Sequence, residues 1–156
     1  MSTETFFAIK NLLDQHAISY RKVHHEPTPT SAEAARARNE DISIGGKAIL
    51  LKVGNSFKLF VLSAALKIDS ARIKNRFSAR KLRFATPAEL LEHTGLVPGS
   101  VPPFGEPLLP FELYVDDSIT QNERIAFNAG SLTDSIVMDV QDYLNIASPE
   151  IFDFSV

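Results

Sequence analysis

The stretch from Lys47 to Ala65, KAILLKVGNSFKLFVLSAA, decides the fold. Its first seven residues form a near-continuous apolar run that opens with a lysine. Such a run, bounded by turn residues, is typical of a strand buried on both faces. Gly54-Asn55-Ser56 then turns the chain, and Phe57–Ala65 is a second apolar run. The stretch therefore predicts a β-hairpin whose first strand is covered on both faces.

Turn and capping residues divide the rest of the chain into short elements. Thr30 and Glu33 have the spacing of a helix capping box, and so do Thr86 and Glu89, with Pro87 at the first helical position. Together with the hydrophobic periodicity, these signals predict helices over residues 4–16, 31–38, 70–77, 87–93 and 140–145. They predict strands over residues 19–25, 81–85, 111–116, 124–129 and 135–138. A proline-set turn is predicted over residues 26–30 and a loop over residues 39–46.

The mixture of helices and strands predicts an α+β fold, with a mixed, mainly antiparallel sheet surrounded by helices. The strand at residues 111–116 has the clearest pattern. Phe111, Leu113 and Val115 alternate with more polar neighbours, which predicts a half-buried strand. The sequence contains no internal repeat, no low-complexity tract and no linker-like boundary, so we expect one domain over residues 1–156.

Composition narrows the classes of function. The 156 residues are 44% hydrophobic and 22% charged, as in an ordinary soluble globular protein. There is no Cys, which excludes disulfides, Cys-ligated zinc, iron–sulfur clusters and thiol nucleophiles. The N-terminal apolar run is too short for a signal peptide, and no stretch reaches the ~20 apolar residues of a membrane helix. We therefore expect a cytoplasmic protein without a membrane partner.

Positive charge is concentrated in one segment of an acidic chain. Between Lys67 and Arg83, seven basic residues stand against Asp69 alone, a local charge of +6 in a chain of net charge −3. A basic face of this kind can hold a phosphate backbone while the acidic remainder limits nonspecific binding. The alternative is a solvated helix-and-turn face without a ligand.

A stiff and apolar loop is predicted between Thr94 and Pro110. It holds five of the nine prolines and three of the seven glycines, together with several bulky apolar residues. A flexible linker would alternate Gly with Ser and avoid bulky apolar side chains. The composition is that of a loop that walls a pocket, and the alternative is an ordered surface connection packed on the core.

The familiar catalytic motifs are absent from the sequence. His24 and His25 are adjacent, so on a strand their side chains point to opposite faces and cannot both serve one site. No His/Asp/Glu cluster has metal-ligand spacing, so we expect neither a metal nor another cofactor. A Ser-His-Asp triad cannot be assembled on spacing, and Gly-x-Ser-x-Gly, Walker and dinucleotide-binding motifs do not occur.

Two other features could bind an anion. Lys47 opens an otherwise apolar strand, where a desolvated ammonium can bind a phosphate, a carboxylate or a developing oxyanion. Asn128-Ala129-Gly130-Ser131 is a turn that can present consecutive backbone N–H groups. The alternatives are a lysine whose head group reaches water, and a plain hairpin turn.

Several segments carry a family resemblance that covers the chain from about His24 to Tyr143. They are HEPTPTSAEAA at residues 25–35, KAILLK at 47–52, LRFATPAEL at 82–90, TG at 94–95 with PGSVPPFG at 98–105, YVDD at 114–117 and IAFNAGS at 125–131. Together and in this order they resemble the YbaK/prolyl-tRNA-synthetase-associated editing domain family, which includes free-standing trans-editing deacylases. PGSVPPFG and the isolated strand lysine are the most specific carriers.

The resemblance implies hydrolysis of the ester between a wrong amino acid and the 3′ end of a tRNA, commonly Ala or Cys on tRNA for proline. Asn-Ala-Gly-Ser looks like the alanine-type members. The implied catalytic residues are Lys47, Gly130 and Ser131, with the glycines offering backbone donors and the substrate's own ribose hydroxyl taking part. The implied substrate-binding residues are Thr30, Gly99, Ser100, Pro102, Phe104, Gly105 and Asn128. We expect the tRNA backbone to contact Arg72, Lys74, Arg76, Arg80 and Lys81.

The resemblance implies mischarged tRNA as a partner, with an aminoacyl-tRNA synthetase as a further one. An activated ester can be cleaved by positioning, a placed water and oxyanion stabilisation, without a nucleophilic side chain. Residues 41–46, with the double glycine before Lys47, have no clear counterpart in the family. The alternative function is a binding module that keeps the fold and pocket but holds tRNA, a synthetase or a small ligand without turnover.

Overall fold

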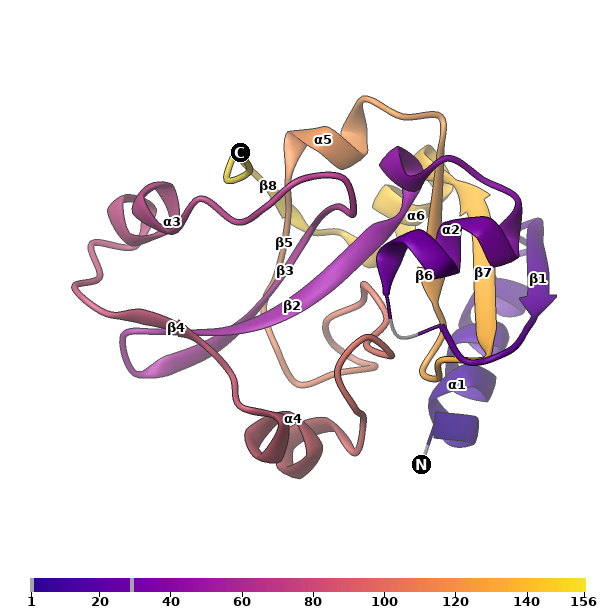
Figure 1. Cartoon of the computed structure of the whole chain (residues 1–156), viewed down its shortest axis with the longest axis horizontal. Helices are drawn as coiled ribbons and strands as arrows, with labels where there is room; N and C mark the ends of the chain where they lie inside the picture. The colour runs from indigo at the N-terminus through magenta and orange to yellow at the C-terminus, as the bar shows by residue number, and fades with distance from the viewer. Residues whose placement is uncertain (1, 29) are drawn as a thin grey trace.

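The predicted hairpin is the centre of the larger of two sheets. The structure, a computed structural model, describes residues 2–28 and 30–156 (Figure 1). Strands β2 (Gly46–Val53) and β3 (Ser56–Ser63) pair antiparallel, from Gly46 opposite Ser63 to Val53 opposite Ser56. Gly54 turns between them with φ of 61°, the left-handed region that glycine adopts without strain.

Three further strands complete this sheet, in the order β4-β2-β3-β5-β8. β4 (Leu82–Phe84) pairs antiparallel with β2 and forms an edge. β5 (Leu113–Val115) runs parallel to β3, and β8 (Glu150–Ile151) runs parallel to β5. A parallel neighbour requires a long crossover, which the chain between β3 and β5 supplies.

The remaining strands form a second sheet, which is antiparallel throughout. Its order is β1-β7-β6, with β1 (Tyr20–His24), β7 (Asp134–Asp139) and β6 (Arg124–Asn128). The two sheets meet where β2 begins, because Gly45 makes an isolated parallel bridge to Ala126 of β6. The α+β class with mixed, mainly antiparallel pairing is confirmed, and the strands are divided between two sheets.

Helices lie around both sheets, as the sequence predicts (Figure 1). They are α1 (Ser2–Gln15), α2 (Ser31–Arg38), α3 (Ser70–Arg76), α4 (Pro87–Thr94), α5 (Asp117–Thr120) and α6 (Val140–Ala147), with a 3₁₀ turn η1 (Ile42–Ile44). The capping box at Thr86 and Glu89 is complete, whereas at Thr30 the structure records only the half in which its hydroxyl accepts from the Glu33 N–H. Pro29 of the predicted turn lies outside the described residues.

The first hairpin strand is covered on both faces, as predicted. Leu50 belongs to a large hydrophobic cluster that β2 shares with the second sheet, α1 and α6. Leu51 and Val53 belong to a smaller cluster on the other face, with Phe60 and Phe154. Neighbouring residues of one strand point to opposite faces, so the two clusters lie on opposite sides of the sheet.

The prediction of a half-buried strand at residues 111–116 is wrong. All three residues of β5 are buried, Tyr114 is only 6% exposed and Asp116 is fully buried. β5 lies between β3 and β8, and the Tyr114 ring stacks on Phe60 with centroids 5.2 Å apart. Alternation misled here because a Tyr and an Asp can be buried when an aromatic cluster and hydrogen-bond donors receive them.

Candidate active site

A small cavity of about 80 Å³ opens where α2, the start of β2, the end of β6 and the proline- and glycine-rich loop of residues 94–110 (the Pro/Gly loop) converge. Its lining combines polar and cationic residues with small ones. The lining residues are Thr28, Thr30, Ser31, Ala34, Arg38, Gly45, Gly46, Lys47, Ala48, Ala64, Gly99, Val101 and Asn128. None of these described residues is an acid or a histidine, so the two cations face the cavity without a carboxylate beside them.

The double glycine before Lys47 allows the two sheets to come together at the cavity. A Cβ on Gly46 would lie 2.6 Å from Cδ1 and 2.9 Å from Cγ1 of Ile125 on β6. A Cβ on Gly45 would lie 3.0 Å from Cβ of Ala64 and 3.2 Å from the Ile42 carbonyl oxygen. Gly45 and Gly46 therefore form a close-packed joint between the two sheets, which fixes where Lys47 emerges.

Lys47 is the second residue of β2, directly after this joint, and is partly buried. Burial lowers the pKa of its ammonium, and the positive charge of Lys67 lowers it further. Among the described residues, no acid lies within ion-pair distance of Lys47. An ammonium with a lowered pKa and no counterion gains from an anionic or strongly dipolar ligand, because such a ligand restores the charge balance.

Arg38 is the second cation of the cavity and is only 6% exposed. Its Nε donates to Ser135 Oγ at 2.9 Å and its Nη2 donates to Asn128 Oδ1 at 3.0 Å. Burial lowers its pKa to about 10. Its partners are neutral, and Nη1 has no acceptor among the described residues. No buried side-chain nitrogen or oxygen of the described residues lacks a partner, so Nη1 is not fully buried, and Arg38 is one of the residues that line the cavity.

Asn128 joins the arginine to the Pro/Gly loop. Its Nδ2 donates to the Gly99 carbonyl oxygen at 2.8 Å, while Oδ1 accepts from Arg38 and from Ser135 Oγ at 3.1 Å. His25 Nε2 lies 2.8 Å from the same Ser135 hydroxyl, and its Nδ1 lies 2.9 Å from the Glu26 carbonyl oxygen, to which it donates. These bonds hold the loop, α2 and β1 at fixed distances around the cavity.

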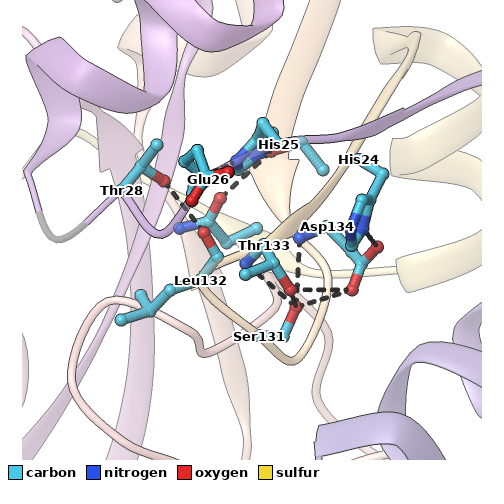
Figure 2. A network of polar contacts seen from close by, with 10 residues as sticks. His24, His25, Glu26, Thr28, Ser131, Leu132, Thr133 and Asp134 are labelled. Atoms are coloured by element: carbon cyan, nitrogen blue, oxygen red, sulfur yellow. Dashed lines mark hydrogen bonds and ion pairs between the residues drawn. The ribbon is translucent and has the colours of Figure 1, made fainter.

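The turn at residues 131–134 supports the wall that carries Thr28 (Figure 2). Backbone N–H groups of His25 and Thr28 donate to the carbonyls of Thr133 and Leu132, at 2.8 and 3.0 Å. Ser131 Oγ donates to Asp134 Oδ2 at 2.9 Å, and His24 Nδ1 lies 2.8 Å from Oδ1 of the same carboxylate (Figure 2). Asp134 lies between Ser131 and His24, whereas in a catalytic triad the histidine lies between the serine and the acid. This group is therefore not a catalytic triad.

The structure brings four of the predicted site residues together. Lys47, Thr30, Gly99 and Asn128 all line the cavity. Gly130 and Ser131 do not line it, and the Gly130 N–H donates to the Ser100 carbonyl oxygen at 3.0 Å. Binding an oxyanion at that N–H would require this bond to open.

The other predicted loop residues are buried and do not line the cavity. Ser100 is buried and its hydroxyl donates to the Val97 carbonyl oxygen at 2.8 Å, which closes the loop on itself. Phe104 packs edge-on against Phe127 and Tyr143 in the core. Pro102 and Gly105 are buried too, and a Cβ on Gly105 would lie 2.5 Å from the Phe111 carbonyl oxygen.

Sequence reasoning missed Arg38 and the glycine pair as site residues. Arg38 looked like an ordinary basic residue at a helix C-terminus. A usable signal was its spacing of four from Ala34, which places a small residue and an arginine on one helix face. The role of Gly45 and Gly46 depends on Ile125 and Ala64, which are distant in sequence.

The basic segment of residues 67–83 divides into two parts. Lys74, Arg80 and Lys81 line a shallow groove of about 500 Å³ with Lys52 and Arg83. Arg72 and Arg76 instead form ion pairs with acids of the C-terminal segment, Asp153 and Glu150.

Other site types find no support in the described part of the chain. No group of three or more His, Asp or Glu side chains there could hold a metal ion. No helix within residues 2–28 or 30–156 is both long and apolar enough to cross a membrane.

Comparison with known proteins places this cavity in a family. The family model "Aminoacyl-tRNA editing domain" matches residues 25–146. The chain is 34% identical over 149 residues to the multifunctional Ser/Thr-tRNA deacylase ProXp-y of Escherichia coli K12, covering 92% of this chain and 88% of that protein. It is 24% identical over 135 residues to the prolyl-tRNA editing protein ProX of Acetoanaerobium sticklandii, covering 83% and 82%.

A solved structure supports the same placement at the level of the fold. A candidate trans-editing enzyme for prolyl-tRNA synthetase superposes with a TM-score of 0.83 at 22% identity, covering 97% of each chain. The matched region of the family model includes Lys47, Arg38, the Pro/Gly loop and Asn128, which are the elements that form the cavity. The chain belongs to the aminoacyl-tRNA editing domain family.

Proposed function

We propose that this protein hydrolyses the ester bond of mischarged aminoacyl-tRNA in trans. One observation carries the proposal: in a chain of the editing family, Lys47 and Arg38 face one small cavity that has no carboxylate in its described lining. The relatives named as a Ser/Thr-tRNA deacylase and a prolyl-tRNA editing protein support the reaction class.

Lys47 stabilises the charge that develops on the ester carbonyl oxygen. Attack by water on the carbonyl carbon moves an electron pair onto that oxygen, and the partly buried ammonium interacts more strongly with it than a hydrated lysine would. The Nη1 group of Arg38 is the second available donor, suited to the same oxygen or to the phosphate of the terminal nucleotide.

The bond between the carbonyl carbon and the ribose oxygen then breaks, and the proton released by the attacking water ends on the ribose oxygen. The described lining offers no histidine or carboxylate to move this proton. The neighbouring ribose hydroxyl of the substrate takes that part, which agrees with a site built for positioning and electrostatic stabilisation.

The amino acid removed is small. A cavity of about 80 Å³ favours side chains such as that of alanine, and the sequence leads us to propose alanine on tRNA for proline. Thr28, Thr30 and Ser31 add hydroxyl groups to the lining, which suit serine and threonine as well. Discrimination by one methylene amounts to only about 1–3 kcal/mol, so overlapping substrates are expected.

The tRNA backbone lies along the basic segment. Lys74, Arg80 and Lys81 are the stronger contacts because no acid pairs with them among the described residues, whereas Arg72 and Arg76 contribute less through their ion pairs. We place the reaction in the cytoplasm and assign it to one domain over residues 1–156. The synthetase that makes the mischarged product is a further partner in this proposal.

Lys47 is tested with a panel of tRNAs charged with Ala, Ser, Thr, Cys and Pro. The Lys47→Ala variant should lose deacylation about 10²- to 10³-fold, the usual cost of removing one oxyanion donor, while its melting temperature stays near that of the wild type. Lys22→Ala is the matched control, since Lys22 is an exposed lysine on β1, away from the cavity.

Two results would count against this proposal. Undiminished hydrolysis by Lys47→Ala would remove Lys47 from its role. Binding of tRNA by the wild type without ester cleavage across the panel would favour the binding module over the deacylase.

A further inference from the structure

A second, apolar groove adjoins the lysine cavity and shares part of its wall. It measures about 190 Å³ and lies between β2, β4, the start of α4 and the Pro/Gly loop. Ala48, Gly99 and Val101 line both spaces, so the groove begins where the cavity ends. Its remaining lining is apolar and includes Leu50, Phe84, Pro87, Leu90 and Pro98.

Phe84 is the unusual residue of this groove. It lies on the edge strand β4 and is 57% exposed, although eleven phenylalanines are available to the core and most described ones are buried or partly buried. A ring that is this exposed contributes little apolar burial to the core. A flat ring at the side of an apolar groove is, however, the feature on which single-stranded nucleic acids stack their bases.

The three spaces follow one another along β2. Residues 46–48 line the lysine cavity, residues 48–50 line the apolar groove, and Lys52 and Gly54 line the basic groove. β4 continues the order, with Phe84 in the apolar groove and Leu82 and Arg83 in the basic one. In Figure 1, β2 runs from near α2 to β4, and the three spaces are lined by successive positions of this strand.

The spacing fits the end of a nucleic-acid strand. From Ala48 to Lys52 the strand rises roughly 13 Å, at about 3.3 Å per residue. A stacked strand advances about 3.4 Å per nucleotide, so this length accommodates about four nucleotides. In a terminal acylated nucleotide the base and the 5′ phosphate are both attached to the ribose that carries the ester, so an apolar site for the base and a basic site for phosphates are both expected close to the ester site.

We propose that the apolar groove is the subsite for the 3′-terminal adenine base of the tRNA and that Phe84 stacks on this base. The location of the ester in the neighbouring cavity rests on the proposed function. The groove then fixes the ribose relative to Lys47, and base stacking contributes affinity without a sequence-reading hydrogen bond.

The test uses uncharged tRNA in which 2-aminopurine replaces the terminal adenine, because stacking quenches the fluorescence of 2-aminopurine. The wild type and Phe84→Tyr should quench the signal. Phe84→Leu, which keeps the apolar surface but lacks the ring, should leave it near the free level and weaken binding roughly 10-fold. Leu91→Ala is the control, since Leu91 is 55% exposed on α4 outside the groove lining and should behave as the wild type.

Equal quenching by Phe84→Leu and the wild type would overturn the inference. A change in amino-acid preference of Phe84→Leu with unchanged quenching would also overturn it, because the amino-acid side chain would then occupy the groove. Quenching that depends on Phe84 without turnover of any mischarged tRNA would reject the proposed deacylase and support the base subsite. Turnover without Phe84-dependent quenching would reject the subsite alone.

Discussion

Lys47 and Arg38 are held in the same cavity at a cost in electrostatic free energy. Burial lowers the pKa of both, and both lack carboxylate partners among the described residues. A structural role alone would favour a paired acid, because unpaired buried charge destabilises the folded state. The arrangement is the one expected when a ligand supplies the missing negative charge, as the proposed function requires.

Gly46 is the residue that the geometry of the site depends on most directly. Gly46→Ala should destabilise the fold by about 1–3 kcal/mol, because the added Cβ overlaps the buried Ile125 side chain. Urea unfolding measures the change. The control is Ile125→Val, which removes the Cδ1 methyl group and should cost about 0.5–1.5 kcal/mol by itself.

The double variant distinguishes overlap from a general intolerance of alanine at residue 46. If the overlap is the cause, Gly46→Ala with Ile125→Val should be more stable than the sum of the single changes predicts. Strict additivity of the two changes would contradict the close-packing account.

At the scale of elements, β5 and the turn after it connect the central sheet to the C-terminal segment. Asp116 is fully buried; its Oδ1 accepts from the Phe154 N–H at 2.6 Å and its Oδ2 from the Ser118 N–H at 3.0 Å. Burial by itself would raise the pKa of Asp116, but hydrogen bonds from Ser118, Phe154 and Ser155 outweigh it and leave the pKa below its usual value of 3.8.

Asp116→Asn should therefore destabilise the protein by about 2–3 kcal/mol at neutral pH, since an amide cannot accept both N–H groups as the carboxylate does. The folded-state pKa is lowered, so the carboxylate's contribution is fully present above about pH 4 and is lost as the pH falls through its folded value. The difference in unfolding free energy between wild type and variant should shrink in that range.

Asp117→Asn provides the comparison for Asp116, because it changes the same charge one residue later, in the first turn of α5. It should change the free energy of unfolding by less than about 1 kcal/mol. An Asp116 effect that stays constant from pH 7 to pH 2 would show that the carboxylate charge is not what stabilises this junction.

At the scale of the whole molecule, an acidic chain keeps one basic groove in line with two further spaces. The net charge of −3 limits nonspecific binding, while Lys52, Lys74, Arg80 and Lys81 gather in the basic groove, where Arg83 is paired with Glu89. Arg72 and Arg76 form ion pairs with Asp153 and Glu150 of the C-terminal segment, so their positive charge is partly neutralised. The effective positive surface is therefore narrower than the sequence indicates.

Replacing Lys74, Arg80 and Lys81 by Ala together should weaken tRNA binding and reduce the slope of log affinity against log salt by about 2–3, close to one unit for each lost phosphate contact. Binding titrations from low to moderate salt measure this slope. The Arg72→Ala, Arg76→Ala double variant should change the slope less. An unchanged slope in the triple variant would mean that the groove is only a solvated face.

The sequence by itself determined the longer elements, the hairpin and the family. Capping residues, turn glycines and apolar runs act over a few neighbouring positions, so Thr86 with Glu89, Gly54 and the strand at Lys47 could be read directly. The short α5, β8 and η1 were not predicted, because elements of two to four residues carry too little periodicity.

Only the tertiary structure decided what faces the cavity. It placed Arg38 in the same cavity lining as Lys47, paired the Gly130 N–H with the Ser100 carbonyl oxygen, and buried Ser100, Phe104 and Gly105 outside the lining. It also buried Tyr114 and Asp116 against the pattern of their own strand. Each outcome depends on partners distant in the chain, such as Asn128, Ile125 and Phe154, and no local pattern encodes which of these comes within 3 Å of a given side chain.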